Sequence, residues 1–303
     1  MASVLFIAPE DLGEAVLATG ALAYALREGG EATILCSAAA APLFRAVPGL
    51  ASLIVASGAT GWAKLAGRRF DVLVDASGVL LSKTIAAQRR YALKPAPIVR
   101  RRAEDWAAAM GAEQSLAPVL WIDAQARGEA AAAAPEAQQL LVLAPGGVSA
   151  GKRWPADRFA AVARRLCDGP LNGADVVVFG AAARDADATR AIVSSLDADG
   201  IAACDLCQRL DLLACAALLE RATLTIGNDN ALTHIAAAVG APTLTLFGPT
   251  DERVRAPHGP RARTLRGRSF EAAALDAGGA MADISIDAVE AAALDLLRAG
   301  GLR

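Results

Sequence analysis

Short apolar runs alternate with helix-like segments along the first 110 residues of the chain. Four runs, at residues 4–8, 32–36, 53–55 and 72–74, have the length and composition of buried strands. The intervening and following segments include two predicted helices, over residues 15–27 and 100–110. Because strands and helices alternate, we predict a parallel α/β sheet covered by helices on its faces.

A second alternation begins at residue 140. It contains predicted strands at 140–143, 176–179, 224–226 and 243–247, and predicted helices at 156–166, 185–195, 210–220, 231–239 and 284–297. The stretch 121–139 between the two alternations is rich in Ala, Glu and Gln and predicts a connection. We therefore predict two Rossmann-like domains, residues 1–139 and 140–303, with a functional cleft at the carboxyl ends of their strands.

Residues 224–250 are the most informative part of the pattern, because they predict a strand, a polar turn, a helix and a second strand in sequence. The turn Asn228-Asp229-Asn230 supplies good helix N-cap residues. Backbone N–H groups and the positive end of a helix dipole at this place favour an anion such as a diphosphate. An ordinary turn with a solvated Asp229 is the alternative.

Composition indicates a globular protein. With 54% hydrophobic residues, 27 Gly and 14 Pro in 303 residues, the chain is neither disordered nor fibrous. The net charge of −2 hides a basic segment, residues 64–102, with ten basic and two acidic side chains. A solvated basic face is the simplest explanation. An anionic small substrate or a phosphorylated lipid surface fits at least as well as nucleic acid, for which no binding module is recognisable.

The chain has five cysteines, and no stretch of the sequence resembles a secretory signal, so we expect reduced thiols and a cytoplasmic protein. Cys204 and Cys207 have redox or zinc-type spacing, but no second pair and no nearby histidine completes a ligand set. We expect neither a metal nor a cofactor, and no segment resembles a membrane span.

Two loops carry candidate chemistry. Residues 146–153 (GGVSAGKR) nearly match a phosphate-binding loop, but Arg153 replaces the magnesium-binding hydroxyl, which argues against a nucleoside triphosphatase. Lys152 remains a candidate phosphate ligand, with an exposed surface lysine as the equal alternative. The first turn lacks GxGxxG, which removes support for a nicotinamide-dependent oxidoreductase. Its carboxylates, including Asp11 and Glu14, are either stabilising helix charges or a general base.

These pieces together resemble glycosyltransferase family 9, the ADP-heptose lipopolysaccharide heptosyltransferases, over nearly the whole chain. The matching segments are Asp11-Leu12-Gly13-Glu14 with residues 16–20, residues 71–75 with Gly78, Ala144-Pro145-Gly146, Lys152-Arg153-Trp154-Pro155, Asn228-Asp229-Asn230 through His234, and residues 247–251. The order and spacing of these segments across both halves carry the resemblance.

The resemblance implies a GT-B fold, with an acceptor-binding N-terminal domain and a C-terminal domain that binds the nucleotide sugar. It implies metal-independent, inverting transfer of heptose, or a related sugar, from an ADP-sugar to an anionic lipopolysaccharide core. Glu14 stands where the family has its catalytic Asp, and Lys152 would neutralise the departing diphosphate. The implied donor-binding residues are Gly146, Gly147, Lys152, Leu210, Asp229, Asn230, Ala231 and His234, and the implied acceptor-binding residues are Asp11, Lys64, Arg100 and Arg101.

Two departures from the family pattern support an alternative. Glu14 replaces Asp, and Asn230-Ala231 replaces a pair of small residues such as Ser-Gly. The alternative is a non-catalytic or divergent GT-B protein that binds nucleotide sugars or glycans. In either case we expect a cytoplasmic location, and peripheral contact with the cytoplasmic face of the inner membrane stays open.

Overall fold

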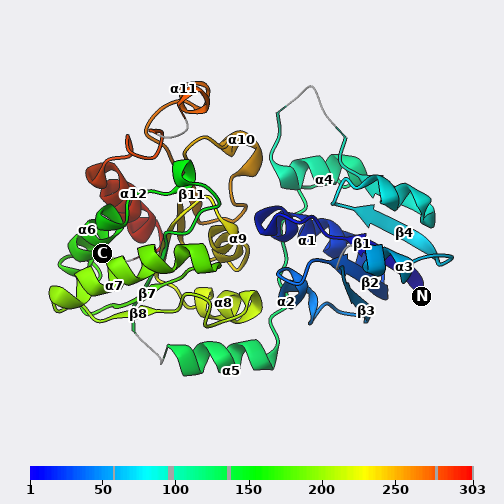
Figure 1. Ribbon diagram of the computed structural model, residues 1–303, viewed down its shortest axis with the longest axis horizontal. Coiled ribbons are helices and arrows are strands. Elements are labelled where there is room, and N and C mark those ends of the chain that lie inside the picture. Colours follow the sequence, from blue (N-terminus) through cyan, green and yellow to red (C-terminus); the bar gives the residue numbers. More distant parts are fainter. Residues whose placement is uncertain (57–58, 95–98, 135–137, 277–278, 302–303) are drawn as a thin grey trace. The chain divides into compact units, whose positions relative to one another are not determined.

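The computed structural model describes residues 1–303 except 57–58, 95–98, 135–137, 277–278 and 302–303. The chain divides into two compact units, Met1–Asp123 and Ala124–Arg303. Each contains a parallel sheet with helices packed on it (Figure 1). The predicted fold class, α/β with two Rossmann-like parallel sheets, is therefore confirmed.

Unit 1 contains a five-stranded sheet in the order β3-β2-β1-β4-β5, in which every pairing is parallel. Its elements are β1 (Ala2–Ile7), α1 (Leu12–Leu26), β2 (Gly30–Cys36), α2 (Ala41–Phe44), β3 (Leu50–Val55), α3 (Ala59–Ala63), β4 (Arg69–Asp75), the 3-10 helix η1 (Leu80–Thr84), β5 (Ala86–Ala92) and α4 (Arg102–Met110). The sequence pattern missed β5, because AAQRRYA is an edge strand with mostly exposed side chains and no apolar run.

Alternate residues along the strands of unit 1 face two different layers. Leu5 and Leu73 belong to a buried cluster that includes Leu65 and Ile85, and Trp62 of α3 packs against this cluster. Phe6 lies on the other side, with its ring 5.6 Å from the ring of Phe44 in α2. One face of the sheet is therefore covered by Leu65, which follows α3, and by Ile85, which follows η1. Helix α2 packs on the other face.

Unit 2 contains a six-stranded sheet in the order β11-β10-β9-β6-β7-β8, again with parallel pairings. Its elements are α5 (Ala124–Ala133), β6 (Leu140–Ala144), η2 (Ala150–Lys152), α6 (Ala156–Cys167), β7 (Asp175–Val178), η3 (Ala183–Asp185), α7 (Ala186–Ala198), β8 (Ala203–Asp205), α8 (Leu212–Leu219), β9 (Leu224–Asn228), α9 (Ala231–Ala238), β10 (Thr243–Leu246), α10 (Glu252–Arg255), β11 (Ala262–Leu265), α11 (Phe270–Leu275) and α12 (Ile286–Ala299).

The division between the units differs from the predicted one. The sequence predicts a boundary after residue 139, whereas the chain divides after Asp123. The difference is α5, which packs on α8 and pairs Arg127 with Glu220 of unit 2. Alanine-rich α5 lacks a marked apolar stripe, so its sequence resembles a linker. The sequence pattern also misses the short edge strands β8 and β11, because neither contains a run of large apolar residues.

Both units have the strand order of a dinucleotide-type Rossmann sheet. In unit 1 the first strand pairs with the second and with the fourth, and in unit 2 β6 pairs in the same way with β7 and β9. The order therefore reverses beside β1 in unit 1 and beside β6 in unit 2. Ligands of such sheets bind at these switch points, outside the carboxyl ends of the strands. We therefore expect a ligand site at the loops that follow β1, β6 and β9.

Candidate functional site at the switch points

In unit 2, two asparagines join the loops that follow β6 and β9. Asn228 donates from Nδ2 to the carbonyl of Pro145 at 2.6 Å, and its Oδ1 accepts from the N–H of Trp154 at 3.1 Å. Asn230 donates to the carbonyls of Ala144 and Gly146, both at 3.0 Å. These bonds satisfy polar backbone groups that a buried loop would otherwise leave unpaired, and they fix the two loops side by side.

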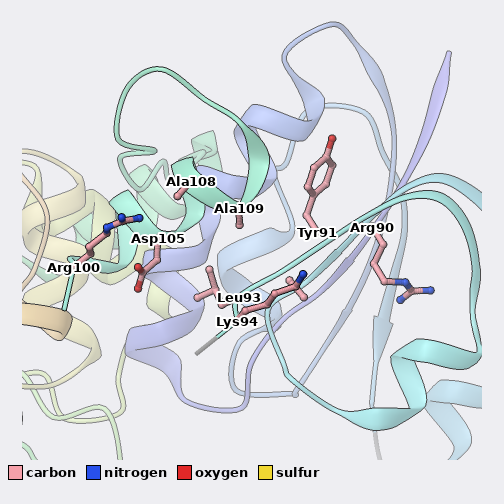
Figure 2. Close-up of a pocket in the computed structure, with 9 residues that line it drawn as sticks. Arg90, Tyr91, Leu93, Lys94, Arg100, Asp105, Ala108 and Ala109 are labelled. Atoms are coloured by element: carbon pink, nitrogen blue, oxygen red, sulfur yellow. The ribbon is translucent and has the colours of Figure 1, made fainter. Parts of the chain in front are cut away.

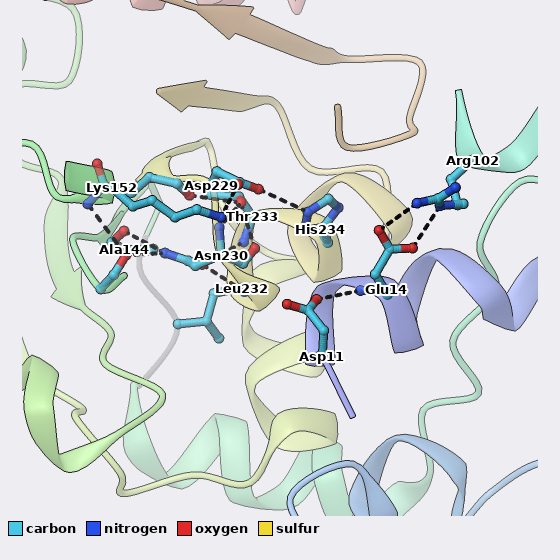
Figure 3. A network of polar contacts seen from close by, with 12 residues as sticks. Asp11, Glu14, Arg102, Ala144, Lys152, Asp229, Asn230, Leu232, Thr233 and His234 are labelled. Atoms are coloured by element: carbon cyan, nitrogen blue, oxygen red, sulfur yellow. Dashed lines mark hydrogen bonds and ion pairs between the residues drawn. The ribbon is translucent and has the colours of Figure 1, made fainter. Parts of the chain in front are cut away.

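Three charged or polar side chains converge on this edge, as Figure 3 shows. The Lys152 ammonium lies 3.0 Å from Oδ2 of Asp229, and Nε2 of His234 lies 3.5 Å from Oδ1 of the same carboxylate. Asp229 is 3% exposed and Lys152 is 18% exposed. The ring of His234 is fully buried. In this arrangement His234 contacts the carboxylate from within the protein, whereas the side chain of Lys152 is partly exposed to solvent.

The same neighbours keep Asp229 ionised. Burial alone would raise the pKa of Asp229, but the imidazole of His234 and the charge of Lys152 outweigh burial and hold this pKa well below the usual range. Asp229 is therefore a fixed negative charge that orients the lysine ammonium. An ammonium has three donors, so one bond to Asp229 leaves Lys152 able to bind an anion as well.

The N-terminus of α9 differs from the open anion site that the sequence predicts. Asn230 caps the helix, and its Oδ1 accepts from the N–H groups of Leu232 at 2.9 Å and Thr233 at 3.3 Å. Two of the donors expected for a diphosphate are therefore already satisfied by the cap. What remains at this end is the N–H of Ala231 and the helix dipole.

Gly146 and Gly147 follow β6 against a buried carboxylate. A Cβ built on Gly146 would lie 2.6 Å from Oδ2 of Asp185, so only glycine fits at this position. Asp185 is buried, accepts from the N–H of Ala182 at 3.2 Å and lies 3.4 Å from the N–H of Gly147. Arg153 closes the loop by donating to the carbonyl of Gly147 at 2.9 Å.

Leu210 lies on the loop that leads from β8 to α8. This loop is tied to the end of β7, because Leu206 and Gln208 donate to the carbonyls of Val178 and Gly180. Leu210 is half-buried and precedes Asp211, the N-cap of α8. Its contact with an adenine ring stays a prediction.

In unit 1, the loop after β1 positions a bidentate ion pair (Figure 3). Asp11 caps α1 by accepting from the N–H of Glu14 at 2.9 Å. Arg102, at the start of α4, donates from Nε to Oε2 of Glu14 at 2.8 Å and from Nη2 to Oε1 at 3.2 Å. Its Nη1 also lies 3.4 Å from Oδ2 of Asp105. Burial raises the pKa of Asp105, although the positive charge of Arg102 acts to lower it.

Asp105 of this cluster also lines a pocket of about 560 Å³. Figure 2 shows the residues that line it. Asp105, Arg90, Lys94, Arg100 and Tyr91 supply its polar lining. Of the predicted acceptor residues, Arg100 lines this pocket, Arg101 is exposed at the start of α4, and Asp11 caps α1. Lys64 is exposed just after α3 and is not among the residues that line this pocket.

Sequence reasoning missed Asp105 and Asp185 as site residues, and it treated Arg102 only as part of the basic segment. Arg102 and Asp105 are three residues apart at the start of a predicted helix, which places them on one face. That spacing was the available signal. The pairing of Arg102 with Glu14 joins residues 88 positions apart, so no local pattern reveals it. Asp185 was visible only as the start of a helix.

The remaining candidates are the five cysteines and the apolar helices. All five cysteines are free, and no group of three or more metal-binding side chains forms in the described part of the chain. Cys204 and Cys207 are each partly exposed. Among the helices of the described residues, none has both the length and the apolar character that crossing a membrane requires.

Comparison with known proteins points to one family. The sequence model described as glycosyltransferase family 9 (heptosyltransferase) matches residues 81–281. The Escherichia coli ADP-heptose lipopolysaccharide heptosyltransferase II structure aligns over 99% of both chains, with a TM-score of 0.79 and 18% identity. A family 9 glycosyl transferase structure from Veillonella parvula aligns over 98% of both chains, with a TM-score of 0.82 and 19% identity. At these identities the structures show a shared fold.

Curated sequences give a closer but shorter match. Lipopolysaccharide heptosyltransferase 2 of Escherichia coli is 33% identical over 116 residues, which is 38% of this chain and 32% of the relative. The Salmonella typhimurium protein of the same name is 31% identical over 129 residues, 42% of this chain and 36% of the relative. The matched segments therefore span about a third of each relative's length.

Proposed function

The chain belongs to glycosyltransferase family 9, and from that premise we propose that it is an inverting glycosyltransferase. The proposed reaction moves heptose, or a related sugar, from an ADP-sugar donor to an anionic lipopolysaccharide core acceptor. The observation that carries the proposal is the Lys152–Asp229 pair at the switch point of unit 2, where Rossmann sheets bind phosphates.

Unit 2 is the proposed donor unit. Lys152 contacts the diphosphate with the ammonium face that Asp229 leaves available, and the N-terminus of α9 adds its dipole. Gly146 and Gly147 let the backbone after β6 approach the nucleotide closely. As the bond from the anomeric carbon to the diphosphate breaks, negative charge grows on the leaving oxygen. The fixed ammonium stabilises that charge without reorganisation.

Unit 1 is the proposed acceptor unit, with Glu14 as the general base. Its carboxylate would take the proton of the acceptor hydroxyl while that oxygen attacks the anomeric carbon from the face opposite the diphosphate. In this proposal Arg102 is a positioning residue, since its bidentate grip fixes the direction of both Glu14 oxygens. No step of the proposed reaction uses a metal ion or an organic cofactor.

The pocket beside Asp105 supports an anionic acceptor. It presents Arg90, Lys94 and Arg100 with a single lining carboxylate, so its net charge favours phosphates or acidic sugars. The relatives named for lipopolysaccharide support the same substrate class. A lipid-linked acceptor would bring the protein to a membrane surface, which we propose to be the cytoplasmic face of the inner membrane.

The test is transfer from ADP-heptose to a purified core acceptor, followed by mass spectrometry of the product. We expect Glu14→Gln to lower the turnover by about 10²-fold to 10⁴-fold, because it removes the base, and to leave ADP affinity unchanged. Retained turnover in this variant would remove Glu14 from the role. A panel of nucleotides in a thermal-shift assay should show selective stabilisation by adenine diphosphates.

The divergent, non-catalytic alternative makes a different prediction from the same assays. It is favoured by one observation, namely that Arg102 engages both oxygens that would accept the proton. Under this alternative, adenine diphosphates stabilise the protein but no product forms with any core acceptor. Product formation by the wild-type chain that depends on Glu14 would reject it.

A further inference from the structure

Three consecutive apolar side chains stand exposed where β4 connects to β5. Val79 is 40% exposed, Leu80 74% and Leu81 49%, and the two leucines begin η1. Single exposed apolar residues are common on protein surfaces, but a contiguous group more often marks a binding surface. Neither the proposed donor site nor the proposed base uses these residues.

Buried hydrogen bonds hold this connection in place. Asp75, at the end of β4, is buried, and its Oδ1 accepts from the N–H groups of Ser77 at 3.0 Å and Gly78 at 3.1 Å. Its Oδ2 accepts from the hydroxyl of the buried Ser82. On the other side, Arg90 donates to the carbonyls of Ser82 and Ile85. The exposed leucines are thus presented by an ordered scaffold.

The surroundings of the leucines are cationic. Leu81 lines a pocket of about 470 Å³ together with Trp62, Arg68 and Arg69, and Lys83 is exposed on η1 itself. In the part of the chain that the structure describes, Arg68, Arg69 and Lys83 form no ion pair with a carboxylate. Trp62 is half-buried, with its ring against the core of unit 1. We call Trp62, Arg68, Arg69, Leu80, Leu81 and Lys83 together the Leu80 surface.

We propose that the Leu80 surface docks the protein on an anionic lipid bilayer. Leu80 and Leu81 enter the boundary between head groups and acyl chains, Trp62 lies at the interface, and the cations contact lipid phosphates. Charge complementarity selects an anionic occupant, and the protruding apolar side chains suit a deformable bilayer. This inference goes beyond the proposed transferase, and its test needs neither donor nor acceptor sugar.

The docking surface and the proposed acceptor pocket of the same unit have no lining side chain in common, although Arg90 lines the pocket and also donates to the connection that carries Leu80. The Leu80 surface includes Trp62 and the segment around η1, which pack on the face of the sheet that carries α3. The acceptor pocket is lined by the end of β5 and by α4 instead. A substitution in the Leu80 surface should therefore change membrane binding without touching Asp105, Arg102 or Glu14.

The test is flotation of the full chain with two kinds of vesicle, pure phosphatidylcholine and phosphatidylcholine mixed with phosphatidylglycerol. We expect wild-type protein to float with the mixed vesicles, and the double variant Leu80→Ser/Leu81→Ser to bind at least about tenfold more weakly, because two leucines no longer enter the bilayer. Lys83→Glu should weaken binding by several-fold, and added salt should weaken binding of the wild type.

Leu275→Ser is the matched control, since Leu275 is an equally apolar side chain that is 92% exposed and is not part of the Leu80 surface. It should float like the wild type. A Leu80→Trp variant gives a direct readout, because brominated lipids should quench its added fluorescence if the side chain enters the bilayer. Equal binding to both vesicle types, unchanged binding by the double serine variant, or no quenching at position 80 would each overturn the proposal. Failure of the wild type to float would also overturn it and favour an acidic protein as the partner.

Discussion

Arg102 holds both carboxylate oxygens of Glu14, with Nε 2.8 Å from Oε2 and Nη2 3.2 Å from Oε1. The pair joins the start of α1 to the start of α4, and neither side chain is more than 25% exposed. A bidentate pair fixes the plane of the carboxylate as well as its charge. The longer side chain of Glu14, compared with the Asp usual in the family, is therefore held in one orientation.

We expect the geometry of this pair to matter more than its charge. Arg102→Lys keeps the charge but loses the fork, so we expect turnover to fall by about 10-fold to 100-fold with little change in the KM for the donor. Arg102→Gln should be lower still. The measurement is steady-state kinetics of sugar transfer. The proposed positioning role is wrong if Arg102→Lys matches the wild type, or if both variants lower donor affinity as their main effect.

Lys152 and Asp229 should behave as a coupled unit in nucleotide binding. Lys152→Ala removes a cation and leaves the carboxylate of Asp229 facing the diphosphate, so ADP affinity should fall by about 10-fold to 100-fold. The double variant Lys152→Ala/Asp229→Asn lacks that repulsive charge and should bind ADP better than additivity predicts. Calorimetric titration of the two single variants and the double variant measures the coupling. Additive losses would mean that Asp229 does not orient Lys152.

Much of the fold follows from local sequence, and the parts that do not have physical causes. The apolar runs that became β1, β6 and β9 are buried on both faces, so they stand out from their surroundings. The edge strand β5 is polar, because one of its sides has no neighbouring strand to bury it. Helix α5 resembles a linker because alanine gives it helix propensity without an apolar face.

The candidate site shows the same limit. The Asn228-Asp229-Asn230 turn was recognisable because cap residues and a strand end stand next to each other in sequence. The side-chain oxygen of Asn230 already accepts from two backbone N–H groups. This contact depends on the rotamer of Asn230, which the sequence does not specify. The partners of Glu14 and Gly146 lie 88 and 39 residues away, on elements whose packing decides the contact.

The low pKa of Asp229 makes a prediction about stability and pH. A carboxylate whose pKa is lower in the folded state stabilises the fold above its unfolded pKa, and that contribution is lost as the pH falls toward the folded value. Asp229→Asn should therefore lower the free energy of unfolding at pH 7 by roughly 1–3 kcal/mol. The gap from the wild type should stay constant down to about pH 5 and narrow below the ordinary value of 3.8.

Urea unfolding at several pH values measures this gap. If the variant and the wild type have the same free energy of unfolding at pH 7, the cost of burying Asp229 equals the stabilisation that its partners provide. If the difference in free energy of unfolding widens as the pH falls, the linkage has the opposite sign. The inference that Asp229 is ionised in the folded protein would then be wrong.

Gly146 tests whether the loop after β6 depends on close approach to Asp185. An added Cβ would lie 2.6 Å from Oδ2 and 2.8 Å from Cγ of Asp185, and the buried carboxylate has little room to move. We expect Gly146→Ala to destabilise the protein by about 1–3 kcal/mol and to weaken ADP binding, because the loop carrying Lys152 shifts. Gly128→Ala in α5 is the matched control, since among the described residues no atom beyond the adjoining helix backbone lies within 4 Å of its Cβ position. Alanine there should stabilise the helix by about 0.5–1 kcal/mol and leave ADP binding unchanged. If thermal unfolding and calorimetry show the two alanine variants to be alike, the packing of Gly146 on Asp185 does not position the loop.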